Sequence, residues 1–154
     1  MSGEVSHELE VNVPANQAWE LYGTIQLAKL VEKEVVNIDR IEVQGDGGLG
    51  TILHLIFKEG TPGFGSYKEK FTKVDDEKRV KETEVVEGGF ADLGFTLYRV
   101  IFEIIEKGNN SCIIKSTIQY EVKEEAAANA QYASIQPLAN IAEISKNYLI
   151  KNKA

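Results

Sequence analysis

The chain has 154 residues, 43% of them hydrophobic and 27% charged, and its 24 acidic and 17 basic residues give a formal net charge of -7. This length suits a core of ordinary size, so residues 1–154 are expected to form a single domain, and the apolar fraction is too high for a disordered chain. Surfaces that bind phosphate backbones need clustered Lys and Arg, so the acidic balance argues against nucleic acid as a partner.

The start of the chain predicts a strand followed by two short helices. Apolar residues alternate with polar ones over residues 6–13, which is typical of a half-buried strand. Pro14 suits the first turn of a helix, where its missing N–H would have no partner, and Gly23 closes that helix. Apolar residues at helical spacing over residues 25–33 predict the second helix.

Six extended segments follow. They are separated by Gly, Asn and Asp residues, which tolerate turn conformations. The segments span residues 38–44, 51–57, 65–74, 79–87, 95–106 and 112–122. Short connections favour antiparallel neighbours, so we expect these strands to form a meander.

The last segment, residues 124–151, is alanine-rich and has apolar residues at i, i+3 and i+4 spacing, which predicts a long amphipathic helix. Pro137 lies inside it and is expected to kink or restart the helix, because proline removes one backbone hydrogen bond. The predicted order is one strand, two helices, six strands and one helix, which is an α+β fold.

A glycine-rich loop separates the first two of the six strands. Residues 45–50 read G-D-G-G-L-G and match the G-x-G-x-x-G pattern of dinucleotide-binding folds. That role requires a helix directly after the loop, because the first N–H groups of the helix hold the phosphate. Here an apolar, β-branched run follows, which predicts a strand. We therefore interpret the glycines as a tight strand connection that needs positive backbone angles.

Cysteine and histidine content argue against two further kinds of site. The single cysteine, Cys112, cannot form an intrachain disulfide, so a cytoplasmic protein is expected. His7 and His54 are the only histidines, and they form no cluster at metal-ligand spacing, so no metal is expected. No basic segment precedes an apolar one at the N-terminus, and no run of about 18 apolar residues occurs, so neither a signal peptide nor a membrane span is expected.

The order of these elements and several motifs resemble the birch pollen allergen superfamily of plant pathogenesis-related class ten proteins. The early strand motif H-E-L-E-V, the glycine loop and the long last helix carry this resemblance, which covers the chain from Ser6 onward. Within the superfamily the chain most resembles the norcoclaurine synthase branch. The motifs that point to that branch are Tyr67–Phe71, Glu77–Arg79, Glu87–Gly94 and Ser111–Thr117.

The resemblance implies a helix-grip fold, in which a seven-stranded antiparallel sheet curves around the long helix, two short helices close one end, and a large cavity lies between sheet and helix. Such cavities bind small aromatic or amphipathic molecules. In the synthase branch the cavity catalyses a Pictet–Spengler condensation of dopamine with an arylacetaldehyde, and no cofactor takes part. A monomer or weak dimer is expected.

The resemblance also implies site residues. Each step of the condensation is a proton transfer, which a desolvated lysine and a carboxylate with a raised pKa can perform. The family's lysine is placed on Lys115 and its glutamate on Glu103, whereas its catalytic tyrosine falls on Ile101 and its aspartate on or near Ser134. Alternation alone puts Lys115 on the polar face of its strand with Gln119, so a solvated lysine remains the competing interpretation.

A further set of residues is expected to line the cavity. These are mostly aromatic or aliphatic side chains on the later strands and the last helix. The predicted ligand-binding residues are Leu55, Phe71, Phe90, Tyr98, Ile101, Phe102, Tyr132, Ser134, Leu138, Ile141 and Ala142.

Two functions from different classes are therefore open. One is an enzyme that condenses an arylethylamine with an aldehyde, with Lys115 as general acid and base and Glu103 as the final base. The other is a non-catalytic carrier of alkaloids, phytohormones or flavonoids with a role in plant defence, which the residues at 101 and 134 favour. A ribonuclease is disfavoured by the acidic charge and by the lack of an evident histidine pair.

Overall fold

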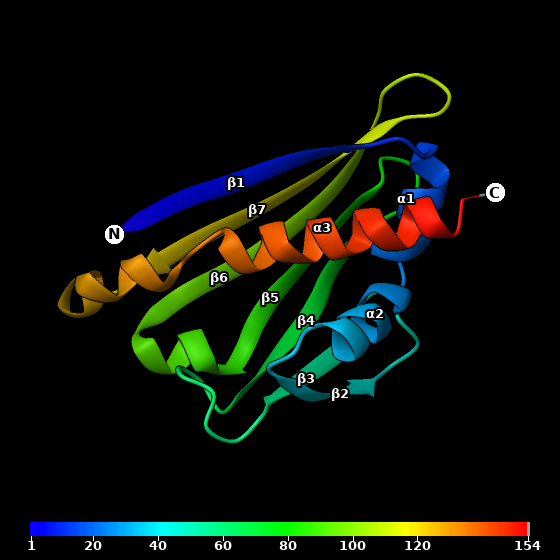
Figure 1. Cartoon of the computed structure of the whole chain (residues 1–154). Helices are drawn as coiled ribbons and strands as arrows, with labels where there is room; N and C mark the ends of the chain where they lie inside the picture. The colour runs from blue at the N-terminus through cyan, green and yellow to red at the C-terminus, as the bar shows by residue number, and fades with distance from the viewer. Residues whose placement is uncertain (154) are drawn as a thin grey trace.

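One antiparallel sheet of seven strands, in the order β1-β7-β6-β5-β4-β3-β2, forms the framework of the molecule (Figure 1). The computed structural model describes residues 1–153. The strands are β1 (Ser2–Val11), β2 (Ile38–Gln44), β3 (Ile52–Phe57), β4 (Ser66–Asp75), β5 (Val80–Gly88), β6 (Phe95–Glu106) and β7 (Cys112–Val122). The six later strands form the predicted meander, and β1 pairs with β7, so β1 and β2 are the two edges.

Within residues 1–153, three α-helices and two 3-10 helices complete the fold. They are α1 (Ala15–Tyr22), α2 (Gln26–Glu34), η1 (Gly89–Leu93), η2 (Glu124–Tyr132) and α3 (Gln136–Lys151). The sheet curves around α3, and α1 and α2 lie at one end of it (Figure 1). The predicted helix-grip arrangement is confirmed. None of the helices in the described chain is both long and apolar enough to cross a membrane.

The long last helix predicted for residues 124–151 is wrong in one respect. The segment forms η2 and then α3, with a break around Ala133. Pro137 lies in the first turn of α3, where the N–H that proline lacks would have no intrahelical acceptor. Pro137 therefore restarts the helix, which is one of the two outcomes that the sequence predicted for it. The helix packs against the sheet along a buried stripe that includes Ala142 and Leu149.

Alternation along the central strands divides the sheet into two faces. On β6 the even-numbered residues Tyr98, Val100, Phe102 and Ile104 are buried on the face toward α3, at 2–8% exposed. Together with buried residues of β7 such as Ile114 they form the core, and each fully buried side chain of this size contributes about 1.5–3 kcal/mol.

The glycine-rich loop joins β2 to β3, as interpreted from the sequence. The Gly47 N–H donates to the buried Thr51 Oγ1 at 2.9 Å, and the Gly48 N–H donates to Asp46 Oδ1 at 2.8 Å. Gly47 has a φ of 94°, which glycine adopts without strain. Two N–H groups of the loop therefore form hydrogen bonds within the turn itself, and the loop is followed by a strand and not by a helix that could hold a phosphate.

Candidate functional site

A cavity of about 930 Å³ lies between the sheet and helices α2 and α3. Strands β2 to β6 supply one wall, and α2, the loop between β3 and β4, η1, η2 and the start of α3 supply most of the rest. The exposed residues of the lining, among them Pro62, Gly63 and Tyr132, mark its mouth between that loop and the start of α3. This volume is in the range of small-molecule sites, roughly 300–1,000 Å³.

The cavity wall is mainly apolar and contains one acid and one base. Among the described residues that line it, Glu69 on β4 and Lys81 on β5 are the only carboxylate and the only amine. Thr83 lies two positions after Lys81 on the same face of β5. A charged pair in an apolar hollow is costly for the fold, so it is a candidate for chemistry.

Lys81 is almost inaccessible, with only 2% of its surface exposed. Its Nζ lies 4.6 Å from the centroid of the Phe71 ring and 5.8 Å from that of Phe102. Burial lowers the pKa of Lys81 to about 8, and the negative charge of Glu69 opposes this shift. The amine can therefore both give up and take up a proton near neutral pH.

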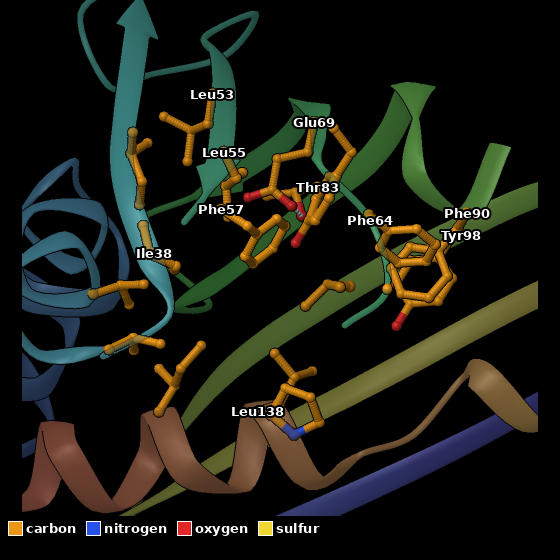
Figure 2. Close-up of a pocket in the computed structure, with 18 of the residues that line it drawn as sticks. Ile38, Leu53, Leu55, Phe57, Phe64, Glu69, Thr83, Phe90, Tyr98 and Leu138 are labelled. Carbon is orange, nitrogen blue, oxygen red and sulfur yellow. Dashed lines mark hydrogen bonds between the residues drawn. The ribbon is translucent and has the colours of Figure 1, made fainter. Parts of the chain in front are cut away.

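Glu69 is half-buried, and the part of it that is accessible faces the cavity. Burial raises the pKa of Glu69 to about 7, while the charge of Lys81 and a hydrogen bond from Thr83 act in the opposite direction. The Thr83 hydroxyl donates to Glu69 Oε2 at 3.5 Å (Figure 2). An acid and a base with pKa values this close to 7 suit general acid–base catalysis.

Aromatic side chains form one end of the cavity. The rings of Phe90 and Tyr98 stack at a centroid distance of 3.7 Å, and Phe64 meets Phe90 edge-on at 4.6 Å (Figure 2). Tyr67 contacts the same group, and burial raises the pKa of its phenol, with the charge of Glu69 adding to the effect. The phenol is therefore neutral and can donate a hydrogen bond next to the carboxylate.

The opposite end is mainly aliphatic, with the ring of Phe57 beside Leu55 (Figure 2). Leu53 and Leu55 on β3, Ile38 on β2 and Leu138 on α3 line it (Figure 2). The cavity thus offers an aromatic region that favours stacking with a planar ring and an aliphatic region that can hold a second apolar group.

The predicted position of the two catalytic residues inside the cavity is wrong. Lys115 on β7 and Glu103 on β6 are directly opposite each other in the strand register, on the face of the sheet away from α3. On its other side, Lys115 is opposite Glu8 of the neighbouring strand β1 in the register. The reason is the two-residue alternation of a strand, because the even-numbered neighbours of these residues face the core. Alternation read from the sequence alone had indicated this face for Lys115, whereas for Glu103 it left a pocket carboxylate and a surface acid both open.

Ile101 and Ala142 also lie outside the cavity lining. Ile101 shares the outward face of β6 with Glu103, whereas Tyr98 lines the cavity, as the odd spacing between 98 and 101 requires. Ala142 is fully buried in the stripe of α3 that packs on the sheet, while Leu138 and Ile141 face the cavity from the neighbouring side of the helix.

The other predicted ligand-binding residues do line the cavity. They are Leu55, Phe71, Phe90, Tyr98, Phe102, Tyr132, Ser134, Leu138 and Ile141. Contact of these side chains with a ligand stays a prediction.

Sequence reasoning missed Glu69, Lys81, Tyr67 and Thr83. A signal for the glutamate was present in Y-K-E-K-F, because Glu69 shares a strand face with two aromatic residues while both lysines share the other. The signal for Lys81 was weaker. Lys81 shares its strand face with Thr83, which is also polar. The only hint that this face is the inner one is that the alternating positions, Glu82 and Glu84, are acidic and so suit the outer face.

Comparison with known proteins places the chain among plant proteins of one family. The model of the Pathogenesis-related protein Bet v 1 family matches residues 1–152. Over 156 aligned residues the chain is 48% identical to norbelladine synthase from Narcissus pseudonarcissus, and the alignment covers 100% of this chain and 96% of that relative.

Two solved structures of norcoclaurine synthase from Thalictrum flavum have the same fold. A point mutant in complex with a transition state analogue superimposes with a TM-score of 0.92 at 35% identity, covering 100% of this chain and 98% of that one. A complex with dopamine and hydroxybenzaldehyde superimposes with a TM-score of 0.89 at 36% identity, covering 100% of this chain and 90% of that one. The resemblance to the norcoclaurine synthase branch is therefore confirmed.

Proposed function

Because the chain belongs to the pathogenesis-related protein Bet v 1 family, we propose that its cavity condenses an arylethylamine with an aromatic aldehyde, with Lys81 and Glu69 as the proton-transfer groups. The observation that carries this proposal is the isolated acid–base pair in an otherwise apolar cavity. The relatives support the substrate class, since one of them was solved with dopamine and hydroxybenzaldehyde.

The first half of the reaction joins the two substrates and releases water. The amine nitrogen attacks the aldehyde carbon, and a carbinolamine forms. Lys81 in its ammonium form then donates a proton to the carbinolamine hydroxyl, which leaves as water while the C=N bond of the iminium forms. A lysine whose pKa is about 8 is a stronger acid than an ordinary lysine and is still largely protonated at pH 7.

The second half closes the ring. The electron-rich ring of the arylethylamine attacks the iminium carbon, so a C–C bond forms while the π bond of C=N breaks and its electron pair moves to nitrogen. The ring carbon then loses its proton. Glu69 as carboxylate accepts that proton, and aromaticity returns. A carboxylate with a pKa of about 7 is a stronger base than an ordinary glutamate and is substantially ionised at neutral pH.

The aromatic end of the cavity supports binding of a planar substrate beside this pair. Phe64, Phe90 and Tyr98 present ring faces and edges, and Tyr67 adds a neutral phenol that can hydrogen-bond to a substrate hydroxyl. Exclusion of water from this region favours iminium formation, because iminium ions are hydrolysed in water.

A non-catalytic carrier of small aromatic molecules, with a part in plant defence, is the second candidate. The size and apolar lining of the cavity favour it, since binding of this kind needs no acid–base pair. The chain is also 28% identical to pathogenesis-related protein 1 of Asparagus officinalis over 154 residues.

The experiment that separates the two functions uses purified protein with dopamine and either 4-hydroxyphenylacetaldehyde or hydroxybenzaldehyde. The rate of condensation and the enantiomeric excess of the cyclised product are measured against buffer alone. We expect a rate above the buffer background and an excess of one enantiomer. A racemic product formed at the background rate would leave the carrier as the function.

A further inference from the structure

Thr83 lies on β5, in the sheet wall of the cavity. In the strand register it is opposite Phe71 of β4 on one side and Val100 of β6 on the other, and all three residues line the cavity. Only 2% of its surface is exposed. A buried hydroxyl needs a hydrogen-bond partner, and on this wall of apolar neighbours Glu69 supplies it.

The contact between the two side chains has a defined direction. The Thr83 hydroxyl donates, and Glu69 Oε2 accepts at 3.5 Å. This is a long O–H···O distance, and hydrogen bonds of active sites often shorten when substrate binds. Threonine is β-branched and has few side-chain rotamers, so it offers the hydroxyl from a nearly fixed position.

We propose that Thr83 is a positioning residue, whose hydroxyl holds Oε2 of Glu69 so that the second carboxylate oxygen is free to accept the substrate proton. The catalytic consequence rests on the proposed function, whereas the orientation of the carboxylate does not. A carboxylate that lost this donor would rotate about its last side-chain bond and would be less well stabilised in its charged form.

The other titratable groups that face Glu69 come from three strands. They are Lys81 on β5, Tyr67 on β4 and Tyr98 on β6. The charge of Lys81 stabilises the carboxylate, and the two phenols are neutral because burial raises the pKa of each. Thr83 is thus the neutral donor whose removal changes the ionisation of Glu69 without altering any charge.

The test is a titration of Glu69 that needs no activity. Protein labelled with ¹³C at the glutamate side-chain carboxyls is titrated by NMR, and the resonance that Glu69→Gln removes is assigned to Glu69. The wild type is expected to titrate near pH 7. Thr83→Val, which keeps the shape and removes the hydroxyl, is expected to titrate at a higher pH, and Thr83→Ala gives the same comparison should the valine variant fold poorly.

Two control variants make the result specific. Thr83→Ser retains the hydroxyl and is expected to titrate like the wild type. Thr72→Val makes the same chemical change on the exposed face of β4 and is expected to have no effect. An unchanged Glu69 midpoint in both Thr83→Val and Thr83→Ala would overturn the proposal.

Activity provides the second readout. The condensation rate of Thr83→Val is expected to be about 3- to 10-fold below wild type at pH 6.5, and the difference is expected to shrink as the pH rises and the carboxylate ionises. Equal rates at all pH values would contradict the positioning role. A wild type without activity would refute the proposed function alone, because the titration still decides whether Thr83 governs Glu69.

Discussion

Glu69 and Lys81 each reduce the stability of the folded protein near neutral pH. Folding lowers the pKa of Lys81 from 10.5 to about 8, so its cost is complete below pH 8 and is relieved as the pH rises from 8 to 10.5. Folding raises the pKa of Glu69 from 4.5 to about 7, so its cost is complete above pH 7 and is relieved as the pH falls from 7 to 4.5. Between pH 7 and 8 both costs are present.

Replacing the pair by neutral residues of similar size is therefore expected to stabilise the protein. The double variant Glu69→Gln/Lys81→Met should increase the free energy of unfolding at pH 7.5 by about 1–4 kcal/mol, measured by urea denaturation. The matched control is Glu103→Gln/Lys115→Met, which removes the same groups from the outward face of the sheet and should change stability by less than about 1 kcal/mol. A double cavity variant less stable than the wild type would contradict this account of the site.

The same two groups determine the expected pH dependence of the reaction. Glu69 must be ionised to accept the ring proton, and Lys81 must be protonated to release water, so the rate should rise through pH 7 and fall through pH 8. The two groups interact, so the two midpoints belong to the pair. The measurement is kcat/KM from pH 5.5 to 9.5, and a rate that rises steadily across this interval would argue against Lys81 as the acid.

At the scale of elements, the strands and helices were largely predictable from the sequence, because hydrophobic alternation and turn residues are local signals. The exception was the segment after Lys123, where the alanine-rich run predicted one helix and the structure has η2 and α3. Pro137 predicted a kink or a restart in this segment, but no residue marked the end of η2 near Ala133. The meander also left open which strand pairs with β1, and the structure shows that this strand is β7.

The face of each strand was harder to predict than the strand itself. A sheet that curves around a helix and encloses a hollow has partly polar residues on its inner face, so apolar alternation no longer identifies that face with certainty. Glu69 and Thr83 are inward on strands whose residues are mostly polar, whereas Ile101 is apolar and faces outward. Lys115 and Glu103 were assigned from the family resemblance, and the lysine and the glutamate that line the cavity are instead Lys81 and Glu69.

The turn between β5 and η1 supports the cavity wall and gives a prediction at this scale. Gly89 has a φ of 49°, and a Cβ there would lie 2.8 Å from Tyr67 Cβ. Gly89→Ala is therefore expected to displace Tyr67 and to destabilise the protein by about 2–4 kcal/mol in urea denaturation. Gly65→Ala is the control, because its Cβ would meet nothing within 4 Å and its φ is not positive. Equal stability of the two variants would refute this role.

At the scale of the whole molecule, the apolar residues form one continuous cluster with two roles. Part of it packs between α3, α1 and the sheet, and part of it, including Val100 and Phe102, also lines a cavity of about 930 Å³. A hollow of this size forgoes packing energy that a solid core would supply, so its retention is consistent with a ligand-binding function. The composition shows how many apolar residues the chain has, but it does not show which of them pack in the core and which line the cavity.

We propose that the reaction takes place at Lys81 inside the cavity and not at any lysine of the outer face. The most direct test compares Lys81→Met with Lys115→Met, two identical substitutions on opposite faces of the same sheet, in the dopamine–aldehyde condensation at pH 7.5. We expect Lys81→Met to lower kcat by about 100-fold or more, with loss of enantiomeric excess, and Lys115→Met to retain the wild-type rate and selectivity. A Lys81→Met variant with the wild-type kcat, or a Lys115→Met variant without activity, would contradict the account.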